Sequence, residues 1–216
     1  MPRVAALLFD LDGTLIDSCA DIAASANYVR RYFGRDPLDV RAVAAMIGDG
    51  LRTLMGRVIA DMAEVDLDES IICFRTHYEQ HCVDATTVYD GVMEALQALA
   101  AIPKVVVTNK PERFSRKICD ELQLSPHFKG IVGGDTCLTK KPDPEPIREA
   151  LRLAGVDADA PAAIVGDGHT DIAAGRAAGI TTCAVSWGIG DKGRLYEQRP
   201  HLLAETPADL VELFEA

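Results

Sequence analysis

The alternation of short apolar runs with amphipathic helical patterns constrains the fold of this chain more than any other feature of its sequence. Five runs have the continuous apolar character of strands that are buried on both faces. These runs are residues 4–9, 104–107, 130–132, 162–165 and 181–185. Helical patterns accompany them at 91–101, 112–123, 143–154 and 170–178. Because strands that alternate with single helices form parallel sheets, the sequence predicts an α/β fold with a Rossmann-like, doubly wound sheet.

One long stretch interrupts this alternation. Between residues 17 and 85 there is almost no strand pattern. Amphipathic helical segments recur there, near 20–33, 39–46, 50–63 and 67–83. We therefore predict an all-helical cap domain at 17–85, inserted into a core made of residues 1–16 and 86–216. The return hinge would lie around 84–90, and a closing helix would run from Pro207 to Phe214.

The charge balance and the cysteine pattern limit the classes of partner. The sequence holds 22 Lys and Arg against 33 Asp and Glu, a formal net charge of −11, which argues against nucleic acid or an anionic membrane. No apolar run reaches the roughly 18 residues of a membrane span, and the run before Asp10 is too short for a signal peptide. Six scattered cysteines without a CxxC pair indicate free thiols. We expect a cytoplasmic monomer or homodimer, in which an anionic substrate needs a local patch of positive charge.

Polar side chains follow three of the predicted strands at the point where each strand ends. DLDGT at 10–14 follows the first run, TNK at 108–110 the second, and GDGHTD at 166–171 the fourth, while Lys141 precedes a helical pattern. Ligands of open α/β sheets bind outside the carboxyl ends of the strands. The sequence thus directs three carboxylates, hydroxyl groups and a lysine toward one place.

This set of side chains suits phosphoryl transfer. Asp10, Asp167 and a backbone carbonyl would hold Mg²⁺ in a cage of oxygen ligands. The carboxylate of Asp10 would attack phosphorus and form an acyl phosphate. Asp12 would protonate the leaving alkoxide and later deprotonate water. Thr108 and Lys141 would bind the equatorial oxygens of the phosphoryl group.

Each motif taken alone has a plainer interpretation. A DxDG run is often a turn or part of a calcium loop, but an EF-hand needs a third acid and a distal Glu that are missing here. GDGxxD alone would be a turn that caps a helix, and a lysine before a proline is usually a solvated loop residue. The joint occurrence of the motifs in this order favours the catalytic interpretation.

The motifs together resemble those of the haloacid dehalogenase superfamily. DLDGT at 10–14 corresponds to its first motif, Thr108 to its second, Lys141 in KPDP to its third, and GDGHTD at 166–171 to its fourth. The resemblance covers the whole chain. It implies that Asp12 contributes its backbone carbonyl as the third protein ligand of Mg²⁺.

The same resemblance assigns roles to the remaining residues. Asp171 would anchor the metal site or the lysine from behind, and Thr108, Asn109 and Gly13 would contact the substrate. Position 168 is Gly where the most similar group usually has Ser, so a minor contact to the phosphate or the metal would be missing.

The positions of the motifs distinguish branches of this superfamily. An acid at Asp12 favours phosphate esters, because the dehalogenases themselves lack it. Residues 15–107 provide 93 positions between the first two motifs, whereas only 31 residues separate Asn109 from Lys141. This is the arrangement of the helical-cap branch, which handles small substrates. TNKP at 108–111 and IGDGLRTLM at 47–55 resemble phosphoglycolate phosphatases most closely, which implies hydrolysis of a small phosphorylated metabolite such as 2-phosphoglycolate through a phosphoaspartate.

A carboxylate on the substrate would need a donor from the protein. Arg52 is our candidate, because it follows the Gly-rich stretch 47–50 and a guanidinium can bind a carboxylate through two hydrogen bonds. The alternative, in which the glycines only cap a helix and Arg52 is solvated, stays open. The basic residues after Asn109, among them Lys110, are expected to form mostly a solvated helix face, although Lys110 could add positive potential near the phosphate.

Other functions of the same fold also stay open. A β-phosphoglucomutase-like phosphotransferase usually has an acidic pair in the fourth motif, whereas Gly166 precedes Asp167 here, which favours hydrolysis. A pyrophosphatase would use the same residues. A non-catalytic binding protein would be expected to have lost an acid or the lysine, and none is lost.

Overall fold

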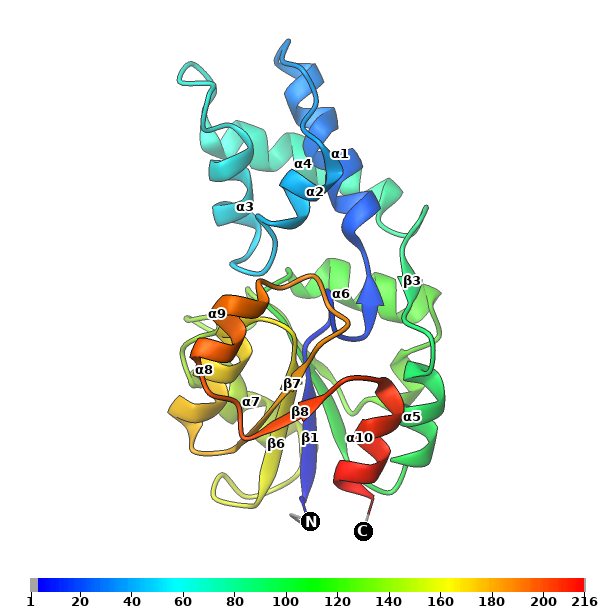
Figure 1. Ribbon diagram of the computed structural model, residues 1–216. Coiled ribbons are helices and arrows are strands. Elements are labelled where there is room, and N and C mark those ends of the chain that lie inside the picture. The colour runs from blue at the N-terminus through cyan, green and yellow to red at the C-terminus, as the bar shows by residue number, and fades with distance from the viewer. Residues whose placement is uncertain (1–3, 216) are drawn as a thin grey trace.

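The computed structural model of the protein describes residues 4–215, so positions 1–3 and 216 of the predicted core lie outside the described residues. A parallel sheet with helices on both faces forms the lower part of the molecule in Figure 1, and a group of helices lies beyond one end of the sheet. Within the described range, no helix is long and apolar enough to cross a membrane.

The main sheet has six strands in the order β5-β4-β1-β6-β7-β8, and every neighbouring pair is parallel. The strands are β1 (Ala6–Phe9), β4 (Lys104–Val107), β5 (Ile131–Val132), β6 (Ala162–Gly166), β7 (Thr181–Val185) and β8 (Leu202–Ala204). This topology confirms the predicted α/β parallel sheet. The edge strand β8 was not predicted, because its apolar run is only three residues long, and only one of these residues is buried.

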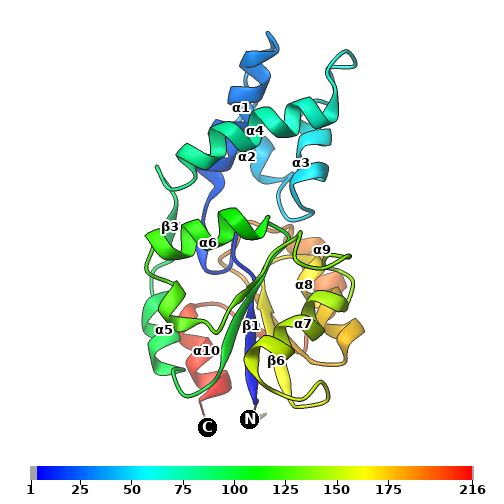
Figure 2. The same ribbon diagram turned by 180° about the vertical axis from the view of Figure 1, so that it is seen from behind.

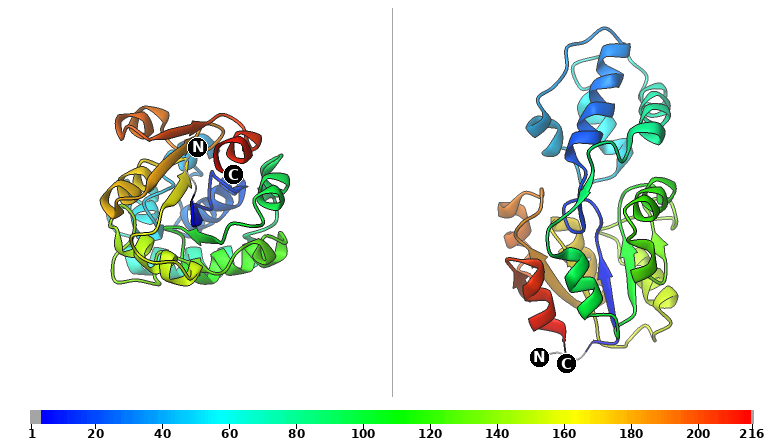
Figure 3. Two further views of the ribbon diagram at one scale, coloured as in Figure 1. Left: turned by 90° about the horizontal axis from the view of Figure 1, so that it is seen from below. Right: turned by 90° about the vertical axis from the view of Figure 1, so that its right-hand side faces the viewer.

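Helices cover both faces of this sheet because the side chains of the strands alternate between two cores. In β1, Leu7 and Phe9 pack into one core and Ala6 and Leu8 into the other. The first core includes residues of α5 (Val92–Ala98), α6 (Glu112–Glu121) and α10 (Pro207–Phe214). The second includes residues of α7 (Glu145–Ala154) and α8 (His169–Ala178). Figure 3 (left) shows these helices on the two sides of the sheet. A short helix α9 (Lys192–Glu197) contacts α8.

Four helices make up the part that follows β1 in the sequence. They are α1 (Cys19–Tyr32), α2 (Val40–Ala44), α3 (Leu51–Val58) and α4 (Leu67–His81), and we call them the helical insert. They pack on one another beyond the carboxyl end of β1 (Figures 1 and 3, right). The insert also touches the rest of the molecule. In Figure 2 its helix α4 lies above α6, and Tyr78 of α4 packs edge-on against Phe114 of α6 at a centroid distance of 5.2 Å.

Two short strands join the helical insert to the sheet. β2 (Ile16–Asp17) and β3 (Thr87–Val88) pair antiparallel, the latter where we expected a return hinge. Asp21 at the start of α1 is buried, and its carboxylate accepts hydrogen bonds from the backbone amides of Ala85 and Thr86 and from the Thr86 hydroxyl. The two connections are thereby tied together. Strands of two residues carry no readable periodicity, so the sequence did not predict them.

Candidate active site

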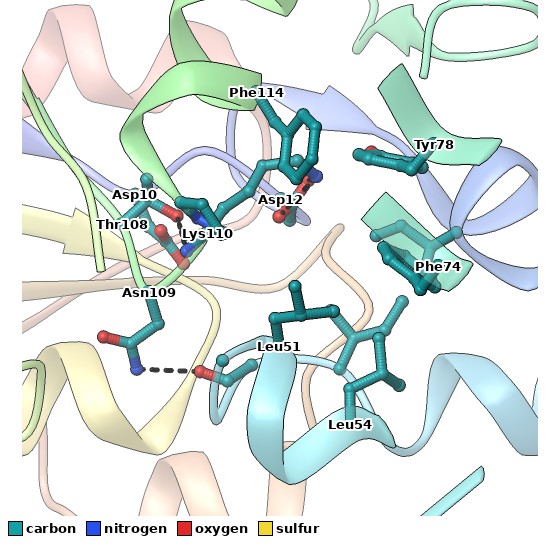
Figure 4. Close-up of a pocket in the computed structure, with 15 residues that line it drawn as sticks. Asp10, Asp12, Leu51, Leu54, Phe74, Tyr78, Thr108, Asn109, Lys110 and Phe114 are labelled. Atoms are coloured by element: carbon teal, nitrogen blue, oxygen red, sulfur yellow. Dashed lines mark hydrogen bonds and ion pairs between the residues drawn. The ribbon is translucent and has the colours of Figure 1, made fainter. Parts of the chain in front are cut away.

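The carboxyl ends of the central strands bring the predicted polar residues together. β1 ends directly before Asp10, β4 before Thr108 and β6 before Asp167. Because these strands are adjacent and parallel, their ends meet at one edge of the sheet. Asp10, Asp12 and Thr108 line one pocket between the sheet and the helical insert (Figure 4).

Lys141 forms the ionic centre of the site. Its ammonium nitrogen lies 2.9 Å from Asp10 Oδ1 and 2.6 Å from Asp171 Oδ1, and it also donates a hydrogen bond to the carbonyl of Val107. The side chain is almost completely buried. Burial lowers the pKa of Lys141, but the charges of Asp10 and Asp171 and the hydrogen bonds to them together raise the pKa by more, so that the net shift is upward. The site thus holds a permanent positive charge beside Asp10.

Asp167 is held rigidly by the loops around it. Its Oδ1 accepts a hydrogen bond from the Thr14 hydroxyl at 2.9 Å, and its Oδ2 accepts from the amides of Ile189 and Gly190 at 2.9 and 2.8 Å. Gly13 lies against the same carboxylate with φ +87°, where an added Cβ would be 2.1 Å from Asp167 Oδ2. We predicted that Gly13 contacts the substrate, but it lines neither opening of the site. The absence of a side chain at Gly13 instead leaves room for the carboxylate of Asp167.

The acidic side chains of the site fit a divalent metal. Asp10, Asp167 and Asp171 each have an oxygen within 4.8 Å of the other two. Burial and the charge of Asp171 raise the pKa of Asp10 to about 6, and burial and the charge of Asp10 raise the pKa of Asp167 to about 6. Asp10 Oδ1 is buried and has an ion pair but no directed hydrogen bond within residues 4–215. A hard cation between Asp10 and Asp167 would relieve this repulsion through the oxygen ligands it prefers.

Asp171 has a different position from the other two acids. Its Oδ1 accepts from Lys141 and its Oδ2 accepts from the amide of Gly168 at 2.9 Å, while the whole side chain is buried. Both oxygens are therefore already used. The geometry agrees with an anchor for Lys141 at the start of α8 rather than with a metal ligand.

The carboxylate of Asp12 turns away from this acidic group toward the helical insert. It accepts hydrogen bonds from the hydroxyl of Ser18 and from Lys110 Nζ, the latter at 2.7 and 3.0 Å to its two oxygens. Lys110 was expected on a mostly solvated helix face, but only 5% of its side chain is exposed. The helix begins at Glu112, as the helical pattern at 112–123 predicted, so Lys110 belongs to the loop after β4, where it lines the pocket.

Asn109 connects the sheet to the helical insert. Its amide nitrogen donates to the carbonyl of Gly48 at 2.9 Å and to that of Lys141 at 3.0 Å, which uses both of its N–H groups. We predicted a contact between Asn109 and the substrate. In the structure Asn109 lines the pocket, and its two donors fix the turn before α3 against the sheet. The contact with the substrate stays a prediction. Lys140 reinforces this contact by donating to the carbonyl of Asp49.

Arg52 is not part of the site, contrary to our prediction. Its guanidinium is largely exposed and forms an ion pair with Asp68 of α4. α3 begins at Leu51, and Leu51 and Leu54 face the pocket. Neighbouring residues of a helix point about 100° apart, because one turn takes 3.6 residues. The side chain of Arg52 therefore points away from the pocket that Leu51 faces.

Sequence reasoning missed most of the pocket wall. Several aromatic and aliphatic side chains of the helical insert and α6 line it, namely Ile22, Leu51, Leu54, Phe74, Tyr78 and Phe114 (Figure 4). On the other side of the turn at 47–50, the site opens into a second cleft that also reaches Asp10 and is lined by Arg57, His169 and Arg194. The helical period indicated that some of these apolar residues are buried, but it did not indicate that they enclose the site.

The fold and the site define an α/β protein in which a buried carboxylate, a lysine and an acidic group that fits a divalent metal meet at the ends of parallel strands. The model of the haloacid dehalogenase-like hydrolase family matches residues 7–185. The chain therefore belongs to the haloacid dehalogenase-like hydrolases, as the motifs predicted. Phosphatases of this family generally use a divalent metal.

Similar proteins cover nearly the whole chain. The phosphoglycolate phosphatase of Chromobacterium violaceum is 39% identical over 202 residues, which are 90% of this chain and 90% of that protein. The phosphoglycolate phosphatase of Aquifex aeolicus is 39% identical over 211 residues, with coverages of 97% and 96%. A crystal structure of a predicted phosphoglycolate phosphatase from Haemophilus somnus has a TM-score of 0.91 at 25% identity and covers 99% of both chains.

Proposed function

We propose that this protein is a Mg²⁺-dependent phosphatase that hydrolyses a small phosphate monoester, 2-phosphoglycolate, through a phosphoaspartate. The arrangement at the end of β1 carries this proposal: Asp10 lies 2.9 Å from the buried Lys141, and Asp12 follows two residues later. The names of the relatives that are 39% identical support the choice of substrate.

Each catalytic side chain has a role that follows from its surroundings. Asp10 would attack phosphorus with its carboxylate and form the phosphoaspartate. Lys141 and the Thr108 hydroxyl would bind the equatorial oxygens, whose charge the site must stabilise. Asp12 would give a proton to the leaving oxygen and then take one from the attacking water. It suits this role because its carboxylate faces the helical insert, where the alcohol part of the substrate would lie.

The metal would be held by the carboxylates of Asp10 and Asp167, with the backbone carbonyl of Asp12 as the third protein ligand. When bound, Mg²⁺ neutralises charge on the phosphoryl oxygens and on the attacking carboxylate. Asp171 keeps Lys141 in place. Thr14 and the amides of residues 189 and 190 fix Asp167 before any ligand arrives.

The helical insert would act as a cap domain at 17–85 over a core of 1–16 and 86–216. The turn at 47–50 contacts Asn109 and Lys140 next to the pocket. A closed cap of this kind excludes water from the phosphoryl group and presents its own side chains to the alcohol part of the substrate. The two tied connections at β2 and β3 would be the hinge.

The geometry favours hydrolysis over transfer to a sugar. Mutases of this fold usually carry an acid immediately before the fourth-motif aspartate. Here that position is Gly166, and an added Cβ would lie 2.3 Å from Asp171 Oδ2. An acidic side chain there would displace the anchor of Lys141.

The decisive experiment is release of inorganic phosphate from p-nitrophenyl phosphate and 2-phosphoglycolate, with Mg²⁺ and with EDTA. We expect Mg²⁺-dependent turnover of both, and a loss of several orders of magnitude in Asp10→Asn, because the neutral amide cannot attack. Trapping of a labile phosphoryl group on Asp10 during turnover would support the intermediate. Near wild-type turnover by Asp10→Asn would refute the proposal.

A further inference from the structure

We infer that Lys110 and Tyr78 form a carboxylate-binding subsite beside Asp12, which selects phosphate esters whose alcohol carries an acid group one carbon from the ester oxygen. This inference rests on the proposed function, because it concerns the leaving group of that reaction. It gives the role that we had predicted for Arg52 to two other residues.

Lys110 is the one cation among the described residues that line the pocket in Figure 4. Apart from the polar residues at the strand ends and Tyr78, the wall is apolar, with Leu51, Phe74 and Phe114 among its side chains. A chain with a net charge of −11 repels anions at long range. A buried ammonium supplies the local positive charge that an anionic leaving group needs.

The ammonium of Lys110 has capacity for another acceptor. Its nitrogen donates to both oxygens of Asp12, at 2.7 and 3.0 Å, and lies 5.0 Å from the centre of the Tyr78 ring. An ammonium has three N–H donors, so one is left for a ligand. Burial lowers the pKa of Lys110, but its interactions with Asp12 and Tyr78 together raise the pKa by more, so the group stays charged.

Tyr78 provides a second, independent sign of a ligand. Only 1% of this residue is exposed, and its hydroxyl has no hydrogen-bond partner among residues 4–215. Buried hydroxyl groups are nearly always paired in folded proteins. In Figure 4 the hydroxyl end of Tyr78 is turned toward Lys110 and Asp12. A carboxylate oxygen at this point would accept hydrogen bonds from both Tyr78 and Lys110.

The distances fit an acid of two carbons. A general acid acts from about 2.6–3.2 Å, and Lys110 Nζ lies 2.7 Å from the same carboxylate of Asp12. The ester oxygen would therefore lie at most roughly 6 Å from Lys110 Nζ. With ordinary bond lengths of about 1.5 Å, a carboxylate one methylene away reaches roughly 3–3.5 Å from the ester oxygen. Its oxygens then fall within hydrogen-bond distance of Lys110.

Arg57 is a competing cation, because it lines the second cleft toward Asp10, as Arg194 also does. Its guanidinium is already used, since it donates to the carbonyl of Met46 at 2.9 Å and forms an ion pair with Asp49. Its side chain is 38% exposed, against 5% for Lys110. A charge that is shielded from water binds a carboxylate more strongly, which favours Lys110.

The test compares kcat/KM for 2-phosphoglycolate with kcat/KM for ethyl phosphate, in which a methyl group replaces the carboxylate. We expect the wild type to prefer phosphoglycolate by roughly 10- to 100-fold, the size of a charged hydrogen bond. Lys110→Met should bring this ratio close to one, Tyr78→Phe should lower it by a smaller factor, and the exposed Lys129→Met should leave it unchanged. Arg57→Gln should also leave the ratio unchanged.

The outcomes separate this inference from the proposed function. If Lys110→Met slows both substrates equally, Lys110 only positions Asp12 and the subsite is refuted. A ratio that falls in Arg57→Gln but not in Lys110→Met also overturns it. A wild type that hydrolyses ethyl phosphate as well as phosphoglycolate refutes the subsite but leaves the phosphatase intact, whereas no phosphate release from any ester refutes the phosphatase.

A measurement on the unmodified protein tests the same subsite without depending on whether the variants fold. Glycolate should inhibit hydrolysis of ethyl phosphate at concentrations at least tenfold lower than glycolamide does, because the amide has the same shape without the charge. Equal inhibition by the two compounds would contradict the subsite even if Lys110→Met does not fold.

Discussion

Replacing the proposed nucleophile should stabilise the fold. Burial, followed by the charge of Asp171, raises the pKa of Asp10 from its ordinary value of 3.8 to about 6. The folded state therefore binds a proton more tightly than the unfolded chain does. Protonation of Asp10 therefore stabilises the folded state. This stabilisation is fully present below pH 3.8 and is lost as the pH rises through 6. Since one pKa unit is about 1.4 kcal/mol, keeping Asp10 ionised in the metal-free protein costs roughly 3 kcal/mol at neutral pH.

Asp10→Asn removes this cost, because the amide has the same shape and no charge to desolvate. In EDTA at pH 7.5 we expect the free energy of unfolding in urea to be about 3 kcal/mol higher for Asp10→Asn than for the wild type. At pH 4 the advantage should fall below about 1 kcal/mol, because Asp10 is then protonated in the folded state and close to half protonated in the unfolded chain. The exposed Asp159→Asn is the control and should show no such difference.

Mg²⁺ provides a further check on the same reasoning. A ligand that binds only the folded state stabilises it more as the ligand concentration rises. The wild type has a carboxylate at position 10 to bind Mg²⁺, whereas Asp10→Asn has a neutral amide there. Added Mg²⁺ should therefore narrow or reverse the gap in unfolding free energy. An Asp10→Asn protein that is less stable than the wild type in EDTA at pH 7.5, or an advantage that does not change with pH, would show that the desolvation argument is wrong.

Four more results are expected. Asp12→Ala should slow single-turnover phosphorylation by about 10²–10⁴-fold for alkyl phosphates and far less for aryl phosphates, whose leaving groups need less protonation; equal losses would contradict its acid role. EDTA should abolish phosphate release, Mg²⁺ should restore it and Ca²⁺ should do so poorly, because its coordination shell is larger and looser. Arg52→Ala should change kcat/KM less than twofold for phosphoglycolate and for aryl phosphate. A tenfold loss of kcat/KM for phosphoglycolate alone would show that Arg52 binds the substrate carboxylate after all. Gly13→Ala should lower the melting temperature and the activity, since its Cβ would overlap Asp167; a wild-type melting curve would contradict this.

The parallel sheet and the residues at its strand ends could be predicted from the sequence. A buried parallel strand reads as a continuous apolar run, and this signal is local. Where the run stops, the chain leaves the sheet at the edge where ligands bind, so Asp10, Thr108 and Asp167 could be placed without coordinates. Their identities, a carboxylate, a hydroxyl and a second carboxylate, then indicated phosphoryl transfer.

Which side chains close the pocket depends on the tertiary structure and could not be predicted from the sequence. Successive residues of a helix point in directions about 100° apart. A difference of one position therefore places Leu51 in the pocket and Arg52 in solvent. Lys110 lies in the loop before α6, which starts at Glu112, and it is buried because the helical insert packs over it. Asn109 fixes a turn 61 positions away in sequence. Such contacts depend on how the helical insert docks on the sheet, which the apolar pattern of either part does not encode.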